Sequence, residues 1–453
     1  MRGLAAAMLA AWAAWHPVAA RAEQDVVEMT TESAVFLAQQ AVLSGDLSLG
    51  YAIAKRLVEA DPTNARALLV IAATAPSLGM AAEGRQAGRA AWRLTDDRAL
   101  RYEIARHTAK AALDEGNVLA TQFWLRRAAE AATTPDDYDQ TASDIRALRD
   151  AQRLRYAVDV SVSPSDNLNN GARGGLLTID DWFTVGPLTA DAQALSGVRG
   201  VAQAQLTYAL GTSGRTVVGL RGYGTVNRLT QASQNAVQGL LTGSDLNIVQ
   251  LEAMVTQELR LPGGDWPVLM TLAAGNTWAG GQDVGQHVRL EAVTPLSRND
   301  PSRLTLSAEA QSPGSDATYA LAASFDGQQS LGAGTLHWQF GMRRTQAPRV
   351  NQSFGQISSE IGYAFGKPLG PMTLSLRAGG SLRDYPEYSL IFANVTGGRQ
   401  DYTTVVGVDA VFQDISVLGY VPRLSLTATS TDSNISRFAT QEIGVTFGIQ
   451  SKF

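Results

Sequence analysis

A period of two residues governs this chain from about residue 155 to its end, where apolar and polar residues alternate in long stretches. The closing segment "EIGVTFGIQSKF" is one example, in which polar or small residues separate Ile443, Val445, Phe447 and Ile449. Alternation of this kind is typical of a β-strand with one apolar and one polar face. About 14 such stretches occur, and they run to about ten residues or more, as a tilted strand that crosses a bilayer requires.

The polar face of these stretches carries charged residues well inside the strands, where a dry sandwich core would not tolerate them. They are Asp159, Glu252, Glu309, Glu360, Arg377 and Asp409. The connections also alternate between short turns, "GTSG", "LPGGDW" and "GKPLGP", and longer loops at 164–199, 226–245 and 384–400. A water-filled lumen and this loop asymmetry are typical of outer-membrane proteins. We therefore predict that residues 155–453 form an antiparallel outer-membrane β-barrel of about 14 strands, rather than a soluble sandwich.

The last strand is expected to pair with the first, because an open sheet edge is not tolerated inside a membrane. Phe447, Ile449 and Phe453 form its apolar stripe. A stripe that ends in an aromatic residue looks like the signal read by the barrel-assembly machinery, so this machinery and outer-membrane lipids are predicted partners. Gly444 and Gly448 offer no side chain to lock the closing seam, which predicts weak pairing between the first and last strands.

The first residues have the pattern of a secretory signal peptide. A basic Arg2 is followed by an apolar run, and then by the small-x-small cleavage site Ala20-Arg21-Ala22. A first transmembrane helix is the alternative, but the run is shorter than the roughly 20 residues that such a helix needs. We predict that residues 1–22 are removed and that the mature protein lies in the cell outer membrane. No cysteine follows the cleavage site, so the mature protein is not expected to be a lipoprotein.

Residues 23–154 have a helical period, with apolar residues three or four positions apart in alanine-rich segments such as "LRYEIARHTAKAAL". Gly45 and Gly79 lie 34 residues apart, and so do Gly50 and Gly84. A helix–turn–helix period of this length, with small residues at helix crossings, is similar to tetratricopeptide repeats; an ordinary helical bundle is the alternative. An even strand count puts both ends of the barrel on one side, so these repeats are predicted to lie in the periplasm.

Few residues are available for catalysis. The chain has no cysteine, and three of its four histidines, His107, His287 and His337, follow the signal peptide without an activated nucleophile that can be named. No phosphate-binding loop and no metal-ligand cluster is present in the sequence. We therefore predict no cofactor, no metal and no enzymatic activity. The net charge of −5 argues against nucleic acid as a partner.

Arginines on the expected lumenal face could select an anionic solute. They include Arg221, Arg343, Arg344 and Arg377. Acidic residues on that face are about as numerous, so ion pairs that brace the barrel are the better interpretation.

Two asparagine-containing stretches go beyond general barrel features. "SVSPSDNLNNGA" closes the first strand with Asp166, Asn167 and Asn169, and "TSTDSNISRF" precedes the last strand with Ser433 and Asn434. Asn and Asp suit tight loops, because their side chains hydrogen-bond to the local backbone and tolerate left-handed conformations. Together with the order of signal peptide, helical repeats, barrel and terminal Phe, these stretches resemble the surface lipoprotein assembly modulator (Slam) family, which carries similar motifs at both places.

The resemblance implies an outer-membrane translocon that delivers surface lipoproteins, or other secreted protein cargo, from the periplasm to the cell surface. The cargo would dock on the helical repeats and then pass through or along the barrel, with the weak seam as one route. An exopolysaccharide exporter and a gated porin with a periplasmic repeat domain are the alternatives.

Overall fold

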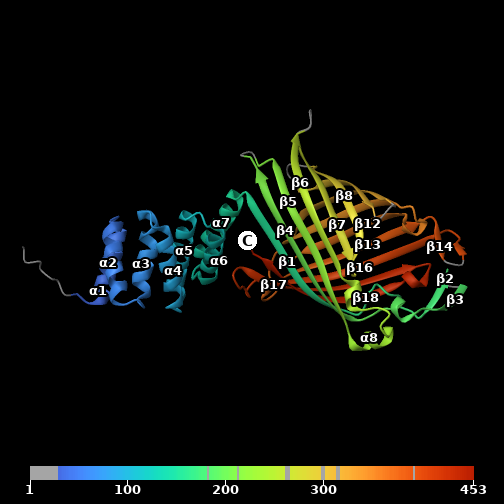
Figure 1. Ribbon diagram of the computed structural model, residues 1–453, viewed down its shortest axis with the longest axis horizontal. Coiled ribbons are helices and arrows are strands. Elements are labelled where there is room, and N and C mark those ends of the chain that lie inside the picture. Colours follow the sequence, from blue (N-terminus) through green and yellow to red (C-terminus); the bar gives the residue numbers. More distant parts are fainter. Residues whose placement is uncertain are drawn as a thin grey trace, which may run out of the picture. The chain divides into compact units, whose positions relative to one another are not determined.

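The structure is a computed structural model that describes residues 29–180, 183–211, 214–260, 266–296, 301–312, 317–390 and 393–452. The predicted signal peptide at residues 1–22 and the terminal Phe453 therefore lie outside the described residues. The chain divides into two compact units, Met1–Trp124 and Leu125–Phe453. Helices make up the described part of the first unit, and strands make up most of the second (Figure 1).

The first unit is a series of α-helices joined by short turns. Its helices are α1 (Thr31–Leu43), α2 (Leu47–Ala60), α3 (Ala65–Thr74), α4 (Ala81–Arg93) and α5 (Arg98–Asp114), and α6 (Val118–Ala131) continues into the second unit. The side chains of Thr30, Asp46, Asn64 and Asp97 each accept a hydrogen bond from a backbone amide of the first helical turn. These N-caps satisfy amides that a helix start leaves free, so they fix where each helix begins. Among the described residues, no helix has the length and apolar character needed to cross a membrane.

Small residues let these helices approach one another closely. A Cβ at Gly50 would lie 2.7 Å from Val42 Cγ2 of α1, and a Cβ at Gly88 would lie 1.9 Å from Thr108 Oγ1 of α5. Ala54 of α2 is fully buried in the core of this unit. The structure confirms the predicted helical N-terminal domain, with small residues where its helices cross.

The second unit contains a closed antiparallel barrel of 14 strands. Helix α7 (Pro135–Ala151) precedes the barrel, so the change from helix to strand falls at residues 152–153. The barrel strands are β1 (Leu154–Ser165), β4 (Gly197–Leu210), β5 (Thr216–Leu229), β6 (Ile248–Arg260), β7 (Pro267–Ala279), β8 (Gln282–Pro295), β9 (Arg303–Ser312), β10 (Thr318–Leu331), β11 (Gly334–Gln346), β12 (Phe354–Ala364), β13 (Met372–Tyr385), β16 (Arg399–Phe412), β17 (Tyr420–Ser433) and β18 (Thr440–Ser451). Strand β18 pairs with β1 and closes the ring. The predicted fold class and strand number are confirmed.

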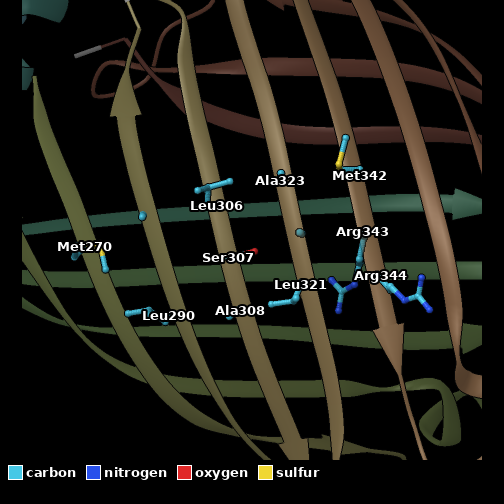
Figure 2. Close-up of a pocket in the computed structure, with 12 residues that line it drawn as sticks. Met270, Leu290, Leu306, Ser307, Ala308, Leu321, Ala323, Met342, Arg343 and Arg344 are labelled. Atoms are coloured by element: carbon cyan, nitrogen blue, oxygen red, sulfur yellow. The ribbon is translucent and has the colours of Figure 1, made fainter.

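The barrel wall has an apolar outer face and a charged inner face. Large apolar side chains alternate on the outside, and Figure 2 shows Leu290, Leu306, Leu321 and Met342 on neighbouring strands. Exposed tyrosines lie near the strand ends, at Tyr156, Tyr208, Tyr319 and Tyr402. An apolar band between two aromatic girdles is typical of outer-membrane barrels, because tyrosine suits the membrane–water interface.

The two ends of the barrel differ in their connections. We call the end where β1 starts and β18 stops the terminal end, and the opposite end the loop end (Figure 1). The loop end carries helix α8 (Gln231–Val237) and two small sheets, β2 (Leu176–Ile179) with β3 (Phe183–Pro187), and β14 (Tyr388–Leu390) with β15 (Ala393–Val395).

The predicted alternation of short turns and long loops is seen only in the part of the ring around β1 and β18. The long loops belong to strands on either side of β1 and β18 in the ring. Elsewhere, β7 and β8 are joined at the loop end by Gly280 and Gly281 alone, with φ values of 58° and 78°. Two positive φ values are what a tight hairpin turn requires, and glycine provides them without strain.

Candidate functional site at the strand seam

The seam between β1 and β18 is the least paired junction between barrel strands in the described part of the chain. Its register partners are Val160 with Ile449, Ser161 with Gly448, Val162 with Phe447 and Ser165 with Gly444. All other neighbouring barrel strands have nine or more register partners. Weak pairing therefore occurs at the junction where the sequence predicted it.

Local chemistry accounts for this gap in pairing. Pro164 lies between the paired residues Val162 and Ser165, and it has no amide hydrogen to donate to a ladder. On the opposite strand, a Cβ at Gly448 would lie 3.5 Å from Ser161 Cβ, which is ordinary contact. Thr446 Oγ1 donates to Ser163 Oγ at 3.2 Å across the seam, but Gly444 and Gly448 contribute no side chain to a cross-strand pair.

Polar residues of the first motif fasten the loop end of this seam. Ser165 Oγ donates to Glu442 Oε1 at 2.6 Å, and Asp166 Oδ1 accepts from the Ile443 amide at 2.9 Å. Asn167 is 1% exposed, and its Nδ2 donates to the Gln441 carbonyl at 3.2 Å. Three successive residues, from the last residue of β1 onward, therefore bind the start of β18. The structure brings Asp166 and Asn167 together at the seam, which their loop propensity alone did not indicate.

Asn169 fixes the return of the first long loop instead. Its Nδ2 donates to the carbonyls of Asp191 and Gln193, each at 2.8 Å, and its Oδ1 accepts from the Leu195 amide at 2.9 Å. One amide side chain thus satisfies three backbone groups of a segment more than 20 residues away. This contact ties the loop down beside the start of β4.

The second motif lies in the neighbouring turn at the loop end. Asn434 Oδ1 accepts from the Gln400 amide at 2.8 Å, and its Nδ2 donates to the Gly398 carbonyl at 3.0 Å. Ser433 Oγ accepts from the Ile435 amide at 3.2 Å. The Asp180 amide donates to the Asn434 carbonyl at 2.8 Å, which joins the first long loop to this turn.

A small apolar core under the loop-end segments holds them together. Its fully or nearly buried members are Tyr385, Tyr388, Val395 and Ile435. Arg399 lies among these rings, with its guanidinium carbon 3.3 Å from the Phe438 ring centroid, and it binds Asp401 at 2.6 Å. Burial raises the pKa of Tyr388 and lowers that of Arg437 next to it. The role of Arg399 was not predicted, because its ring contacts combine Tyr385 and Tyr388 from one connection with Phe438 from another that is distant in sequence.

Oppositely charged residues line the inner wall in pairs. Examples are Arg303 with Asp326 at 2.5 Å, Arg377 with Asp409 at 3.5 Å and Arg343 with Glu309 at 3.9 Å. One pair crosses the seam, since Arg423 of β17 lies 3.9 Å from Asp159 of β1. The intervening Gly448 of β18 has no side chain to obstruct it, and a Cβ there would lie 3.6 Å from Arg423 Nη2.

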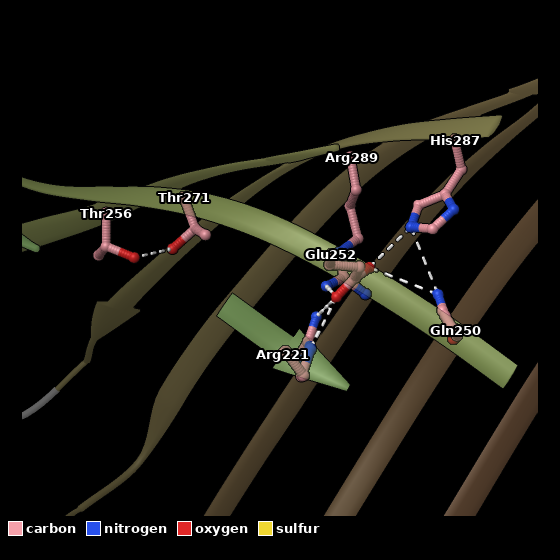
Figure 3. Close-up of polar contacts among 7 residues, drawn as sticks. All are labelled: Arg221, Gln250, Glu252, Thr256, Thr271, His287 and Arg289. Carbon is pink, nitrogen blue, oxygen red and sulfur yellow. Dashed lines mark hydrogen bonds and ion pairs between the residues drawn. The ribbon is translucent and has the colours of Figure 1, made fainter. Parts of the chain in front are cut away.

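A denser network on the inner wall surrounds Glu252, away from the seam. Glu252 and His287 are each 4% exposed, and Glu252 Oε1 lies 2.8 Å from His287 Nε2 (Figure 3). Arg221 Nε donates to Glu252 Oε2 at 2.7 Å, and Arg289 Nη2 donates to the same oxygen at 3.3 Å. Gln250 Nε2 donates to Glu252 Oε1 at 3.5 Å as a fourth contact, so this buried carboxylate links β5, β6 and β8 and stiffens the wall.

The expectation that Arg344 is a lumenal arginine is wrong. Arg221, Arg343 and Arg377 do lie on the inner wall, with acidic partners as predicted. Arg344 follows Arg343 directly in strand β11, and successive strand residues point to opposite faces. It shares the outer face with Met342, which is 63% exposed.

Helical residues of the second unit contact the terminal end of the barrel. Arg126 donates to the Leu418 carbonyl at 3.0 Å and to Ser451 Oγ at 2.9 Å. Lys452 lies 5.7 Å from the ring centroid of Tyr138 on α7, and burial raises the pKa of this tyrosine. Arg126 of α6 and Tyr138 of α7 therefore contact Ser451 and Lys452 at the C-terminal end of β18, which is one of the two seam strands.

The remaining predicted residues lie apart from the seam loops. Phe447 and Ile449 are 54% and 50% exposed on the outer face of β18, where a stripe that is read during assembly would have to lie. His107 is on α5, and burial lowers its pKa. His337 is on β11, well away from His107 in sequence. Within the described ranges, no group of three or more side chains is arranged to hold a metal ion.

Comparison with known proteins gives no family match and no match among curated proteins. The chain is similar to the Yersinia enterocolitica type III secretion translocator chaperone SycD, with 19% identity, over 27% of this chain and 86% of that one, at a TM-score of 0.24. It is similar to OmpT, an outer membrane protein of Vibrio cholerae, with 6% identity, over 66% and 100% of the chains, at a TM-score of 0.33. A bacterial polysaccharide outer membrane secretin aligns with 8% identity, over 65% and 98%, at a TM-score of 0.30.

Proposed function

We propose that this chain is an outer-membrane translocon that delivers surface lipoproteins, or other protein cargo, from the periplasm to the cell surface. The sparsely paired seam between β1 and β18 is the observation that carries the proposal. An acylated protein needs an aqueous route for its polypeptide and an apolar route for its lipid chains. A seam that opens sideways offers both, because it connects the lumen with the bilayer.

In this proposal the terminal end of the barrel faces the periplasm. Short turns at one end and long loops at the other support the orientation, because outer-membrane barrels keep their short turns on the periplasmic side. The turn between β10 and β11 at the terminal end has only Gly332 and Ala333, whereas residues 166–196 join β1 to β4 at the loop end.

The uneven fastening of the seam supports a directional opening. The loop end is held by the bonds from Ser165, Asp166 and Asn167 to the start of β18. Towards the terminal end, Val158 and Asp159 of β1 have no register partner in the described part of β18, although this strand continues to Ser451. The seam would therefore open first beside the periplasmic leaflet, where the acyl chains of a lipoprotein lie before export.

Docking of cargo on the helical domain is the second element of the proposal. Phe36 and Leu43 of α1 are 62% and 78% exposed, and their seven-residue spacing puts them on one helix face. Leu49 at the start of α2 is 47% exposed. Exposed apolar side chains in a group mark protein-binding surfaces more often than isolated ones do. The proposed activity requires no catalytic step, no cofactor and no nucleic acid.

Protease shaving of intact cells tests this function. Cells with and without the gene are treated with protease, and the released peptides are identified by mass spectrometry. We expect one or a few proteins to disappear from the surface of the deletion strain and to remain present inside the cells. Cells that carry a Phe36→Ser, Leu43→Ser double variant should show the same loss in part, while the barrel itself is assembled normally.

An unchanged surface proteome would contradict protein export. An exopolysaccharide exporter would then be indicated if the deletion strain lost surface carbohydrate. A gated porin would be indicated if the purified protein gave large, steady conductance in planar bilayers.

A further inference from the structure

Arg344 is a cation on the outer wall of the barrel. Its side chain is exposed, and it makes no ion pair or hydrogen bond with any residue of the described ranges. An arginine on the lipid-facing side costs about 2–4 kcal/mol at the bilayer midplane and about 0–1 kcal/mol near the interface. A partner from the membrane would remove this cost, so the surroundings of Arg344 indicate what it binds.

The depth of Arg344 places it within reach of the loop-end interface. It pairs in register with Leu321 of β10, two positions from the pair of Tyr319 with Gln346. Tyr319 is 59% exposed and belongs to the tyrosine girdle at this end. Two residues of a strand span about 7 Å, and an arginine side chain can extend over such a distance towards the interface.

An apolar hollow lies on the same outer face, directly beside Arg344. It has a volume of about 510 Å³ and spans strands β7 to β11 (Figure 2). Small residues at its floor alternate with larger ones at its sides: Ala292, Ala308 and Ala323, with Leu306, Leu321 and Met342. The register produces the hollow, because Ala308 lies opposite Leu321, and Ala323 lies opposite Met342.

We propose that this wall binds a phosphate-bearing lipid of the leaflet at the loop end. Arg344 binds the headgroup phosphate through its planar guanidinium, which matches phosphate oxygens in a two-point contact. An acyl chain of the same lipid lies in the hollow over Ala308 and Ala323. The site lies across the ring from the seam, so it goes beyond the proposed cargo route and does not depend on it.

Native mass spectrometry of the full-length mature barrel in non-ionic detergent tests this site. The probes are dioleoyl phosphatidylglycerol, dioleoylglycerol with the same chains but no phosphate, and inorganic phosphate. We expect the phosphatidylglycerol to bind about tenfold more tightly than dioleoylglycerol, since a hydrogen bond to a charged group contributes about 1.5–3 kcal/mol. Arg344→Gln should abolish this difference, and Ala308→Phe should weaken both lipids by filling the hollow.

Arg343→Gln is the matched control. It removes the same charge from the adjacent residue, which also borders the hollow but whose side chain lies 3.9 Å from Glu309 on the inner wall. Binding of phosphatidylglycerol to Arg343→Gln should equal binding to the unchanged protein. Folding of each variant is checked by the heat-dependent shift of its mobility in detergent gels.

Three results would overturn the proposal. An equal loss of phosphatidylglycerol binding in Arg343→Gln and in Arg344→Gln would show that only the net charge of the protein matters. Competition by inorganic phosphate as strong as by the lipid would show a free anion site. Dimers that are lost only in Arg344→Gln would show that the wall meets a second copy of the chain.

Discussion

A disulfide across the seam gives the sharpest test of the proposed route. Ser161→Cys and Gly448→Cys place two thiols in register partners of β1 and β18, in a chain with no other cysteine. A Cβ at Gly448 would lie 3.5 Å from Ser161 Cβ, which is within the usual range of about 3.5–4.5 Å for a disulfide. The bond should therefore form without moving either strand.

The pairing explains why this junction would open. One ladder hydrogen bond per register pair contributes about 1 kcal/mol when the freed groups regain water, so the four ladder pairs by themselves resist opening by about 4 kcal/mol and would allow an open fraction of about one in a thousand. The junctions with nine pairs resist by about 9 kcal/mol and would open several thousandfold more rarely. Cargo that binds the freed strand edges would shift the seam further towards opening.

The assay compares surface proteomes of cells that carry the oxidised and the reduced double variant. We expect oxidation to block export and a reductant to restore it. The control is Thr403→Cys with Thr431→Cys, whose hydroxyls lie 3.0 Å apart between the fully paired β16 and β17. Unimpaired export after complete crosslinking of the seam, verified on non-reducing gels, would refute a lateral route.

Three further predictions concern stability. Asn167→Ala should lower the temperature at which the barrel unfolds in detergent gels, because it leaves buried backbone partners without a hydrogen bond, which costs about 1–3 kcal/mol of stability. The matched control is Asn235→Ala at an exposed position, which should not change this temperature. Gly88→Val should destabilise the helical unit by about 1–3 kcal/mol or more through its clash with Thr108, seen as an earlier loss of ellipticity at 222 nm. Burial holds the pKa of His107 below its ordinary 6.5, so the helical unit should lose stability as the pH falls through that value. His107→Gln should flatten this pH dependence. A melting temperature of the helical unit that rises on acidification would contradict the argument.

Local periodicity was sufficient to predict most of the fold. Alternation of apolar and polar residues is set by strand geometry, and it located 14 strands; apolar residues three or four positions apart located the helical N-terminal domain. The same rule shows why the predicted lumenal position of Arg344 was wrong, since Arg343 and Arg344 are adjacent and cannot both face the lumen. Loop propensity identified Asn167 and Asn434 as loop residues but gave no indication of their partners.

The sequence by itself determined the class of the protein, because the two-residue period, the length of the strands and the charges on one face depend only on neighbours along the chain. The glycines of β18 predicted which junction is weak, but only the tertiary structure decided which pairs remain there, since register places Pro164 of β1 between the residues that pair with Gly444 and Gly448. It also decided that Arg399 meets rings from distant loops, and that Arg344 lies beside an apolar hollow. Contacts between residues far apart in sequence arise from ring closure and strand register, and no local pattern encodes them.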